Sequence, residues 1–203
     1  MQIALSRYPT GLTSILFFAS GFAALLYQIA WQRVLFGWYG VDLDSVSAIV
    51  SIFMLGLGIG ALIGGWLSDR FQRHRILIFS LVEFTLAVFG LFSLDIMDST
   101  GAFFAASSLP YIVLLTFCVF LIPTCAMGAT LPLLVTELVD RTQSVGFSTG
   151  SLYFVNTLGA AAGALAAGTI LLPRVGLDGL VATAALLNFL VSTTAFVAFR
   201  RTA

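Results

Sequence analysis

The chain has 203 residues, of which 60% are hydrophobic and only 9% are charged, whereas soluble domains carry roughly a quarter charged residues. This composition excludes a water-soluble domain and indicates a chain embedded in lipid. Nine basic residues, all arginines, balance nine acidic ones, and this neutral balance argues against binding to nucleic acid, which requires a basic surface.

Six apolar stretches are each long enough to cross about 30 Å of hydrocarbon as a helix. We therefore predict an all-α integral membrane fold, organised as one domain of six transmembrane helices over residues 1–203. The connections are too short for a folded soluble domain, which needs at least about 50 residues. In chain order, the predicted helices cover residues 11–35, 45–67, 75–94, 109–138, 150–172 and 179–199.

The first predicted helix carries polar residues toward its outer end. Tyr27 and Gln28 give it a polar side, and hydrogen bonding to another helix is the simpler explanation for both. Arg33 is expected to extend to the membrane surface beside Trp31 and Trp38.

Small residues recur in the second and fifth predicted helices at a spacing that lets helix backbones approach closely. The two glycine-rich stretches lie about half the chain apart, and each belongs to the middle helix of a group of three. This arrangement is expected of two inverted three-helix repeats in transporter folds, although glycine–alanine runs also recur in any close-packed membrane helix. The predicted packing glycines are Gly56, Gly60, Gly64, Gly159, Gly163 and Gly168.

The loop after the second predicted helix carries Asp69, Arg70, Arg73 and Arg75. The order of residues, with Gly65 followed by Asp-Arg and further basic residues, resembles the signature loop between helices 2 and 3 of the major facilitator superfamily. In that superfamily the loop holds two six-helix halves together. The resemblance implies that the six predicted helices form half of such a bundle, and that a second half would come from a partner.

Glu83 lies about two turns into the third predicted helix. An ionisable side chain at that depth is costly in lipid, so it should face other helices or a water-filled cavity. Two interpretations stay open. Glu83 could be a proton or cation site, or it could form a hydrogen bond between helices.

The fourth predicted helix contains Pro123 and Pro132, which predict a kink or a break. The segment Met127–Pro132 is expected to unwind, and its free carbonyls would then bind a cation or be satisfied by neighbouring groups. Asn156 places a polar amide in the fifth predicted helix. The candidate intramembrane polar site therefore comprises Glu83, Gln28, Tyr27, Asn156 and Thr130.

No catalytic residue, metal site or cofactor is predicted. The chain has a single histidine, and the sequence contains no clustered metal ligands, no nucleophile–base pair and no cofactor-binding loop. A membrane enzyme is therefore the least favoured class of function.

Arginine positions predict the orientation, because cytoplasmic loops carry an excess of basic residues. With the N-terminus inside, seven arginines fall on the cytoplasmic side and two on the other. Both termini are therefore expected to be cytoplasmic. The seven are Arg7, Arg70, Arg73, Arg75, Arg141, Arg200 and Arg201, and the two are Arg33 and Arg174.

Three ordered segments together resemble the membrane domain of bacterial spermidine-synthase-like proteins, in which a bundle related to the major facilitator superfamily precedes a soluble aminopropyltransferase domain. That soluble domain has no counterpart before the last residue, Ala203, so the resemblance implies the membrane part alone. The segments are Ser20–Gln28 with Trp31 and Arg33, Gly128–Leu134, and Tyr153–Ala160 followed by Gly163, Gly168 and Leu171–Pro173.

The resemblance predicts a non-catalytic, multi-pass subunit of a bacterial inner membrane. Besides the lipid bilayer, its expected partner is a protein, either a separate subunit that it anchors or scaffolds or a second copy of the chain. Helices 2 and 5 are the expected contact faces. The alternative is a half-size transporter of a cation or polyamine that acts as a dimer.

Overall fold

The computed structural model describes residues 10–39, 43–104 and 109–200. Across these ranges the chain forms helices joined by short turns, because an apolar backbone in lipid has to satisfy its N–H and C=O groups internally. The helices are α1 (Thr10–Tyr39), α2 (Leu43–Arg70), a 3₁₀ turn at Gln72–His74, α3 (Arg75–Phe104), α4 (Leu109–Thr142), α5 (Val145–Ala166), a π-helical turn at Ala167–Leu171 and α6 (Leu172–Arg200).

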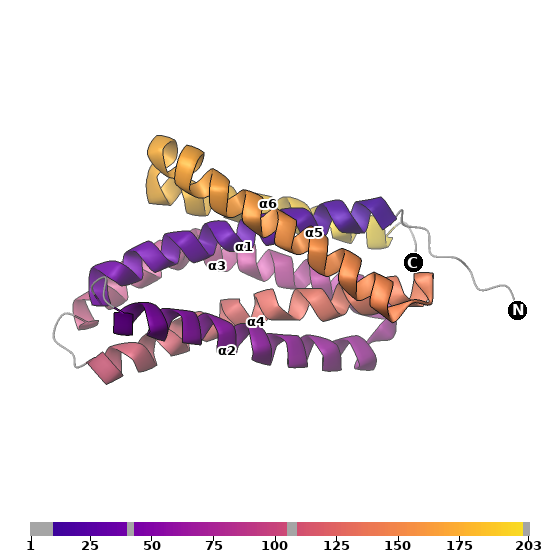
Figure 1. Cartoon of the computed structure of the whole chain (residues 1–203), viewed down its shortest axis with the longest axis horizontal. Coiled ribbons are helices and arrows are strands. Elements are labelled where there is room, and N and C mark those ends of the chain that lie inside the picture. The colour runs from indigo at the N-terminus through magenta and orange to yellow at the C-terminus, as the bar shows by residue number, and fades with distance from the viewer. Residues whose placement is uncertain (1–9, 40–42, 105–108, 201–203) are drawn as a thin grey trace, which may run out of the picture.

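Five segments of the described chain are long and apolar enough to cross a membrane. The last of them, Val145–Ala198, has 54 residues and would be about 80 Å long as one straight helix, more than twice the thickness of the hydrocarbon layer. It is interrupted at Gly176, whose φ of 67° is non-helical, and the chain reverses direction there (Figure 1). The fold is therefore an all-helical membrane fold.

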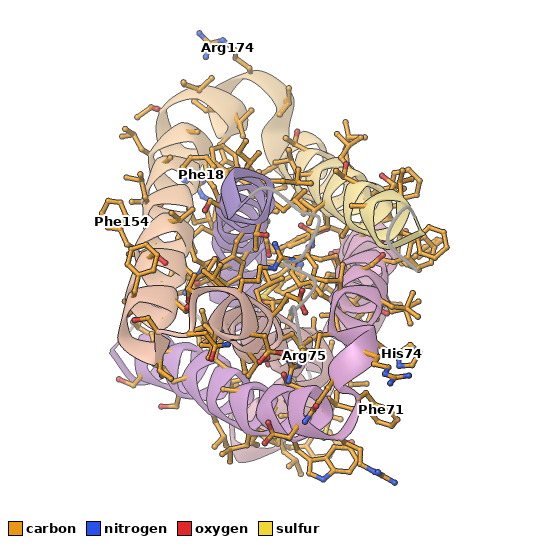
Figure 2. The ribbon with its side chains drawn as sticks, turned by 90° about the vertical axis from the view of Figure 1, so that its right-hand side faces the viewer. Phe18, Phe71, His74, Arg75, Phe154 and Arg174 are labelled. Atoms are coloured by element: carbon orange, nitrogen blue, oxygen red, sulfur yellow. The ribbon has the colours of Figure 1, made fainter. Side chains whose placement is uncertain are left out.

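Successive helices run in opposite directions, so that the ends of the helices gather at two ends of a bundle (Figure 1). The end of α2, the start of α3 and the end of α4 lie together, and they bring Arg70, Arg75 and Arg141 to one end. Arg174 lies close to the reversal between α5 and α6 at the opposite end (Figure 1), and its side chain projects outward (Figure 2). Three charges of the sequence pattern, Arg7, Asp42 and Arg201, lie outside the described residues.

The most extensive helix contacts are α2 with α4, α1 with α5, and α3 with α6. Each of these pairs joins a helix of the first three to a helix of the last three. The α3–α6 pair also contains a reciprocal polar contact, in which the Ser80 Oγ donates to the Ser192 carbonyl at 2.8 Å and the Ser192 Oγ donates to the Ser80 carbonyl at 2.8 Å. The two three-helix groups are therefore interleaved rather than side by side.

Glycines set the close approach of α2 and α4. A Cβ added to Gly60 would collide with the backbone of Cys125, and one added to Gly64 would collide with the backbone of Ala129. From the other side, Gly128 of α4 meets the backbone of Leu57. Small residues at these positions let the two helix backbones touch directly.

The contact between α1 and α5 is built in the same way. Gly159 and Gly163 of α5 lie against the backbone of Phe18 and Phe22, respectively. Gly168 departs from the pattern, because it lies in the exposed π-helical turn and a Cβ there would meet no neighbouring atom. The glycine-bearing faces of α2 and α5 are thus covered by α4 and α1 of the same chain.

An aromatic cluster around Trp31 occupies the core, contrary to the expectation that this side chain lies at the membrane surface. Trp31 is fully buried, and its Nε1 donates to the Ser93 Oγ at 2.9 Å. Its ring lies 5.1 Å from the rings of both Tyr27 and Phe120, measured between centroids. Burial of the whole indole, with its N–H satisfied, is more favourable than an interfacial position.

Helix α4 runs without interruption from Leu109 to Thr142, with both prolines inside it. Hydroxyl groups near the prolines donate to backbone carbonyls: Thr130 to Met127 at 2.7 Å and Thr136 to Pro132 at 2.8 Å. Threonine hydroxyls of this kind are one of the means by which membrane helices tolerate proline. The unwound segment expected between Met127 and Pro132 is therefore absent from α4 as described.

Candidate intramembrane polar site

A cavity of about 130 Å³ lies inside the bundle, and every one of the helices α1 to α6 contributes to its wall. The cavity therefore depends on the interleaved packing, because it closes only when all of these helices are in place. Its lining residues are Ser20, Gly21, Ala24, Leu25, Gln28, Phe53, Leu57, Leu86, Met127, Thr130, Asn156, Ala160 and Asn188.

Five of the side chains that line the cavity are polar. Gln28 and Ser20 come from α1, Thr130 from α4, Asn156 from α5 and Asn188 from α6. The rest of the wall is apolar. The site therefore combines a cluster of hydroxyl and amide groups with a hydrophobic surface, the composition of most small-molecule sites in proteins.

Glu83 adjoins the cavity through Ser20. The Glu83 carboxyl group is fully buried, and its Oε1 accepts a hydrogen bond from the Ser20 Oγ at 2.6 Å. Because Ser20 itself lines the cavity, a single hydroxyl separates the acid from the cavity interior.

Two buried oxygen atoms at this site have no hydrogen-bond partner among the described residues. They are the Oε2 of Glu83 and the Oδ1 of Asn188. A buried acceptor without a donor costs about 1–3 kcal/mol, and the cost is larger for a charged group. A buried polar atom without a partner calls for an explanation, such as an ordered water molecule or an ion beside it.

Tyr27 was predicted to belong to the polar site, but it faces a different neighbour. Its ring stacks on Trp31 and fits against Gly90 of α3, and its hydroxyl donates to the Leu86 carbonyl at 3.3 Å. Tyr27 is therefore part of the contact between α1 and α3 and does not line the cavity.

Gln28, Thr130 and Asn156, which the sequence pattern grouped with Glu83, all line the cavity. Sequence reasoning did not select Ser20 or Asn188 as polar site residues. The sequence does indicate Asn188 as a candidate, since it is one of only two asparagines in the chain and lies within an apolar helix. No sequence feature distinguishes Ser20, because single serines are common in membrane helices.

A second polar cluster lies at one end of the bundle, around the loop between α2 and α3. The Arg75 Nε donates to the Ser68 carbonyl at 3.0 Å, and the guanidinium also pairs with the Asp140 carboxylate of α4. The Ser68 hydroxyl meets the Thr136 hydroxyl beside this pair. Arg75 thereby ties the end of α2, the start of α3 and the end of α4 together.

The remaining residues of this loop point away from the bundle. Arg75 turns inward, whereas Phe71 and His74 project outward (Figure 2). Asp69, Arg70 and Arg73 are also exposed. Of the loop charges that resemble the superfamily signature, Arg75 holds the fold together, and the others are presented at the surface.

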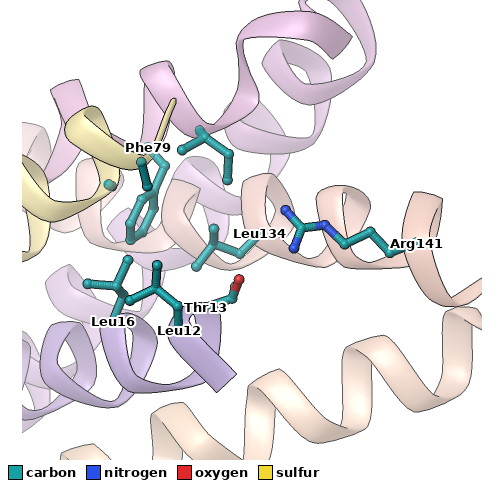
Figure 3. A pocket seen from close by; sticks show the side chains of 9 residues that line it. Leu12, Thr13, Leu16, Phe79, Leu134 and Arg141 are labelled. Carbon is teal, nitrogen blue, oxygen red and sulfur yellow. The ribbon is translucent and has the colours of Figure 1, made fainter. Parts of the chain in front are cut away.

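A smaller pocket of about 20 Å³ lies near the same end, between α1, α3, α4 and α6. Arg141 extends from α4 toward an apolar lining that includes Leu16 and Phe79 (Figure 3). Its guanidinium pairs with Glu137 at 2.9 Å. This volume holds about one water molecule, so the pocket is too small for an organic ligand.

Metal-ligating side chains do not gather in the part of the chain that the structure describes, where no three His, Cys, Asp or Glu residues form a group. The central cavity is therefore the candidate functional site, and it offers oxygen atoms and apolar surface.

Long apolar helices packed around a central cavity define the chain as an all-helical membrane protein, and comparison with known proteins gives its family. The model of the Major Facilitator Superfamily matches residues 7–203. The chain therefore belongs to the Major Facilitator Superfamily. No solved structure matches it.

Two curated relatives are polyamine aminopropyltransferases. The chain is 27% identical to the polyamine aminopropyltransferase of Oceanobacillus iheyensis over 194 residues, covering 93% of this chain and 36% of the relative. It is 27% identical to polyamine aminopropyltransferase 1 of Streptomyces coelicolor over 154 residues, covering 75% of this chain and 27% of the relative. The chain thus spans about a third of the relatives' length, and the similarity is confined to their membrane portion, which confirms the resemblance found in the sequence.

Proposed function

We propose that the chain crosses the membrane six times and forms half of a major-facilitator-type bundle, built from two inverted three-helix repeats. The helix pairing supports this proposal. Exchanging α1–α3 with α4–α6 converts the α1–α5 contact into the α4–α2 contact and leaves the α3–α6 contact in place, and these are the most extensive contacts of the described chain. Such an exchange is expected of inverted repeats.

The function that we propose is that of a non-catalytic membrane unit that anchors a partner protein at the inner membrane of a bacterium. The observation that carries the proposal is the alignment with the aminopropyltransferases, which covers nearly all of this chain but only 36% of the relative from Oceanobacillus iheyensis. In these relatives a unit of this kind accompanies a much larger remainder. The partner that we propose is accordingly an aminopropyltransferase.

The exposed charges between α2 and α3 are the docking surface that we propose for that partner. Asp69, Arg70 and Arg73 stand clear of the bundle at the end where the arginines concentrate, which is the cytoplasmic end according to the distribution of basic residues. Exposed charges contribute more to recognition and association rate than to the stability of the fold.

Co-purification tests the anchor function. The tagged chain, extracted from native membranes in mild detergent, should bring down a protein with aminopropyltransferase activity. The double variant Arg70→Ser/Arg73→Ser should reduce the recovered activity, whereas Arg174→Ser at the opposite end should not. A chain that purifies as a lone monomer without this activity would contradict the proposal.

A half-size transporter acting as a homodimer is the second candidate, and the central cavity with its adjoining acid favours it. Uptake of a cation or polyamine into proteoliposomes should then depend on Glu83, because an intramembrane acid that couples to a cation cannot be replaced by a neutral amide. Glu83→Gln should abolish the uptake. Absence of uptake by the parent chain, or unchanged uptake by the variant, would exclude this function.

A further inference from the structure

The hydroxyl protons at the central cavity are already committed to acceptors in the protein. The Ser20 hydroxyl donates to Glu83 at 2.6 Å, and the Thr130 hydroxyl donates to the Met127 carbonyl at 2.7 Å. Each hydroxyl carries one proton, so both oxygens present only lone pairs toward the cavity. The Asn188 Oδ1 is a third acceptor and has no partner among the described residues, so three of the residues that line the cavity carry hydrogen-bond acceptors without a proton of their own to offer.

The acid beside this cluster is the fully buried Glu83, and none of the arginines in the described part of the chain lines the cavity. Arg75 and Arg141 are paired with Asp140 and Glu137 near one end of the bundle, and neither contributes to the central cavity. An ionised carboxylate buried without a counter-charge is strongly unfavourable. A cation held in the cavity would supply both the counter-charge and the missing donors.

The remaining wall and the volume limit what that cation can be. Leu57, Phe53 and Met127 give the cavity an apolar side, which suits a hydrocarbon chain and disfavours a hydrated metal ion. A dry cavity of about 150 Å³ is known to accommodate a benzene molecule, so one of about 130 Å³ holds a ligand of about six heavy atoms.

We propose that this cavity binds a primary alkylammonium ion of about four carbon atoms, with its ammonium group at Ser20, Thr130 and Asn188 and its alkyl chain against Leu57 and Phe53. An ammonium group has three N–H donors, which match the three acceptor oxygens. The Glu83 carboxyl group, one hydroxyl away, would supply the balancing charge on losing its proton to solvent as the cation binds. The site lies within a single chain and needs no residue from a partner.

This proposal rests on the second candidate function and deepens it by naming a class of ligand. A binding measurement tests the ligand site separately from transport. The experiment uses the full chain in lipid nanodiscs, with n-butylammonium chloride as the probe and isothermal titration as the readout at constant ionic strength. Binding without uptake would retain the site and reject transport. If neither binding nor uptake of n-butylammonium is detected, the proposed site is rejected.

Three competing probes test the chemistry. Tetramethylammonium has the charge without N–H donors, n-butanol has the chain without the charge, and 1,4-diaminobutane would place a second charge against the apolar wall. Each should bind at least about tenfold more weakly than n-butylammonium, since a hydrogen bond to a charged group changes affinity by about that factor or more. Equal binding of tetramethylammonium would overturn the assignment of a primary ammonium.

Glu83→Gln should weaken n-butylammonium binding at least about tenfold, and Glu137→Gln, a matched change near the end of the bundle, should leave it unchanged. Asn188→Leu removes the unpartnered oxygen at similar volume and provides a second variant if Glu83→Gln fails to fold. Equal loss in Glu137→Gln, or undiminished binding in both Glu83→Gln and Asn188→Leu, would refute the proposal.

Discussion

At the scale of single residues, neighbouring glycines of α2 face different surroundings. Gly60 lies against the backbone of Cys125, whereas a Cβ at Gly58 would meet no atom within 4 Å. The two residues have the same side chain, the same helix and nearly the same depth. Their tolerance of substitution should therefore differ because of the contact with α4 alone.

Alanine substitutions test this difference. Gly60→Ala should lower the stability of the chain by about 1–3 kcal/mol, because the added methyl group overpacks a backbone contact that cannot shift cheaply. Gly58→Ala should be neutral or slightly stabilising, since alanine is the better helix former. Thermal unfolding in detergent, followed by circular dichroism, measures both variants, and equal unfolding temperatures would disprove the tight α2–α4 contact.

At the scale of helices, Arg75 joins three elements through one buried guanidinium group. Its partners differ in kind, since the Ser68 carbonyl is part of the backbone of α2 and Asp140 is a largely exposed side chain of α4, with 65% of its side-chain surface accessible. The ion pair with Asp140 is therefore screened by water and contributes little by itself. Most of the stabilisation by Arg75 comes from its contact with the end of α2.

A double-mutant cycle separates these contributions. Arg75→Gln should cost about 1–3 kcal/mol, because it leaves a buried carbonyl without its donor. Asp140→Asn should cost less, and the coupling between the two should be about 0.5–1 kcal/mol. Arg73→Gln, at an exposed position in the same loop, is the control. A coupling energy near zero would show that Arg75 and Asp140 do not interact in the membrane.

Sequence alone predicted the apolar helices, because their length and hydropathy follow directly from the thickness of the bilayer. It did not predict which side of each helix is buried. The hydrophobic residues of helix α1 are spread around the whole helix, so neither the full burial of Trp31 nor the turn of Tyr27 toward α3 is visible in its pattern. Gln28, Thr130 and Asn156 were identified as polar groups, but their meeting in one cavity depends on contacts between helices that are distant in the sequence.

At the scale of the whole molecule, the alternating helices give the bundle one end rich in arginine and one end poor in it. Cysteine labelling tests whether the arginine-rich end is cytoplasmic. In a background without Cys118 and Cys125, Gln143→Cys marks the turn between α4 and α5, and Val175→Cys marks the turn at Gly176; both positions are exposed.

A membrane-impermeant maleimide added to intact spheroplasts should label Val175→Cys only, whereas Gln143→Cys should react after the membrane is permeabilised. The reverse pattern would invert the orientation. Reaction of both positions in intact spheroplasts would contradict the single crossing of the membrane by α5, which lies between them.

The interleaved pairing of α1–α5, α2–α4 and α3–α6 also determines the order in which the molecule can be assembled. During synthesis, α1 and α2 enter the lipid before α4 and α5, their main partners, have been made. The early helices must therefore remain stable as independent spans, with their glycine faces against lipid, until the later helices arrive. Assembly is thus a late event that follows insertion.

It follows that the chain should tolerate a break between α3 and α4. Residues 1–104 and 109–203, expressed as two fragments in one cell, should associate in the membrane and co-purify, because nearly all major contacts form between them. Each fragment alone should insert but remain susceptible to protease. If either fragment is protease-resistant by itself, or if the two do not associate, the interleaved arrangement is wrong.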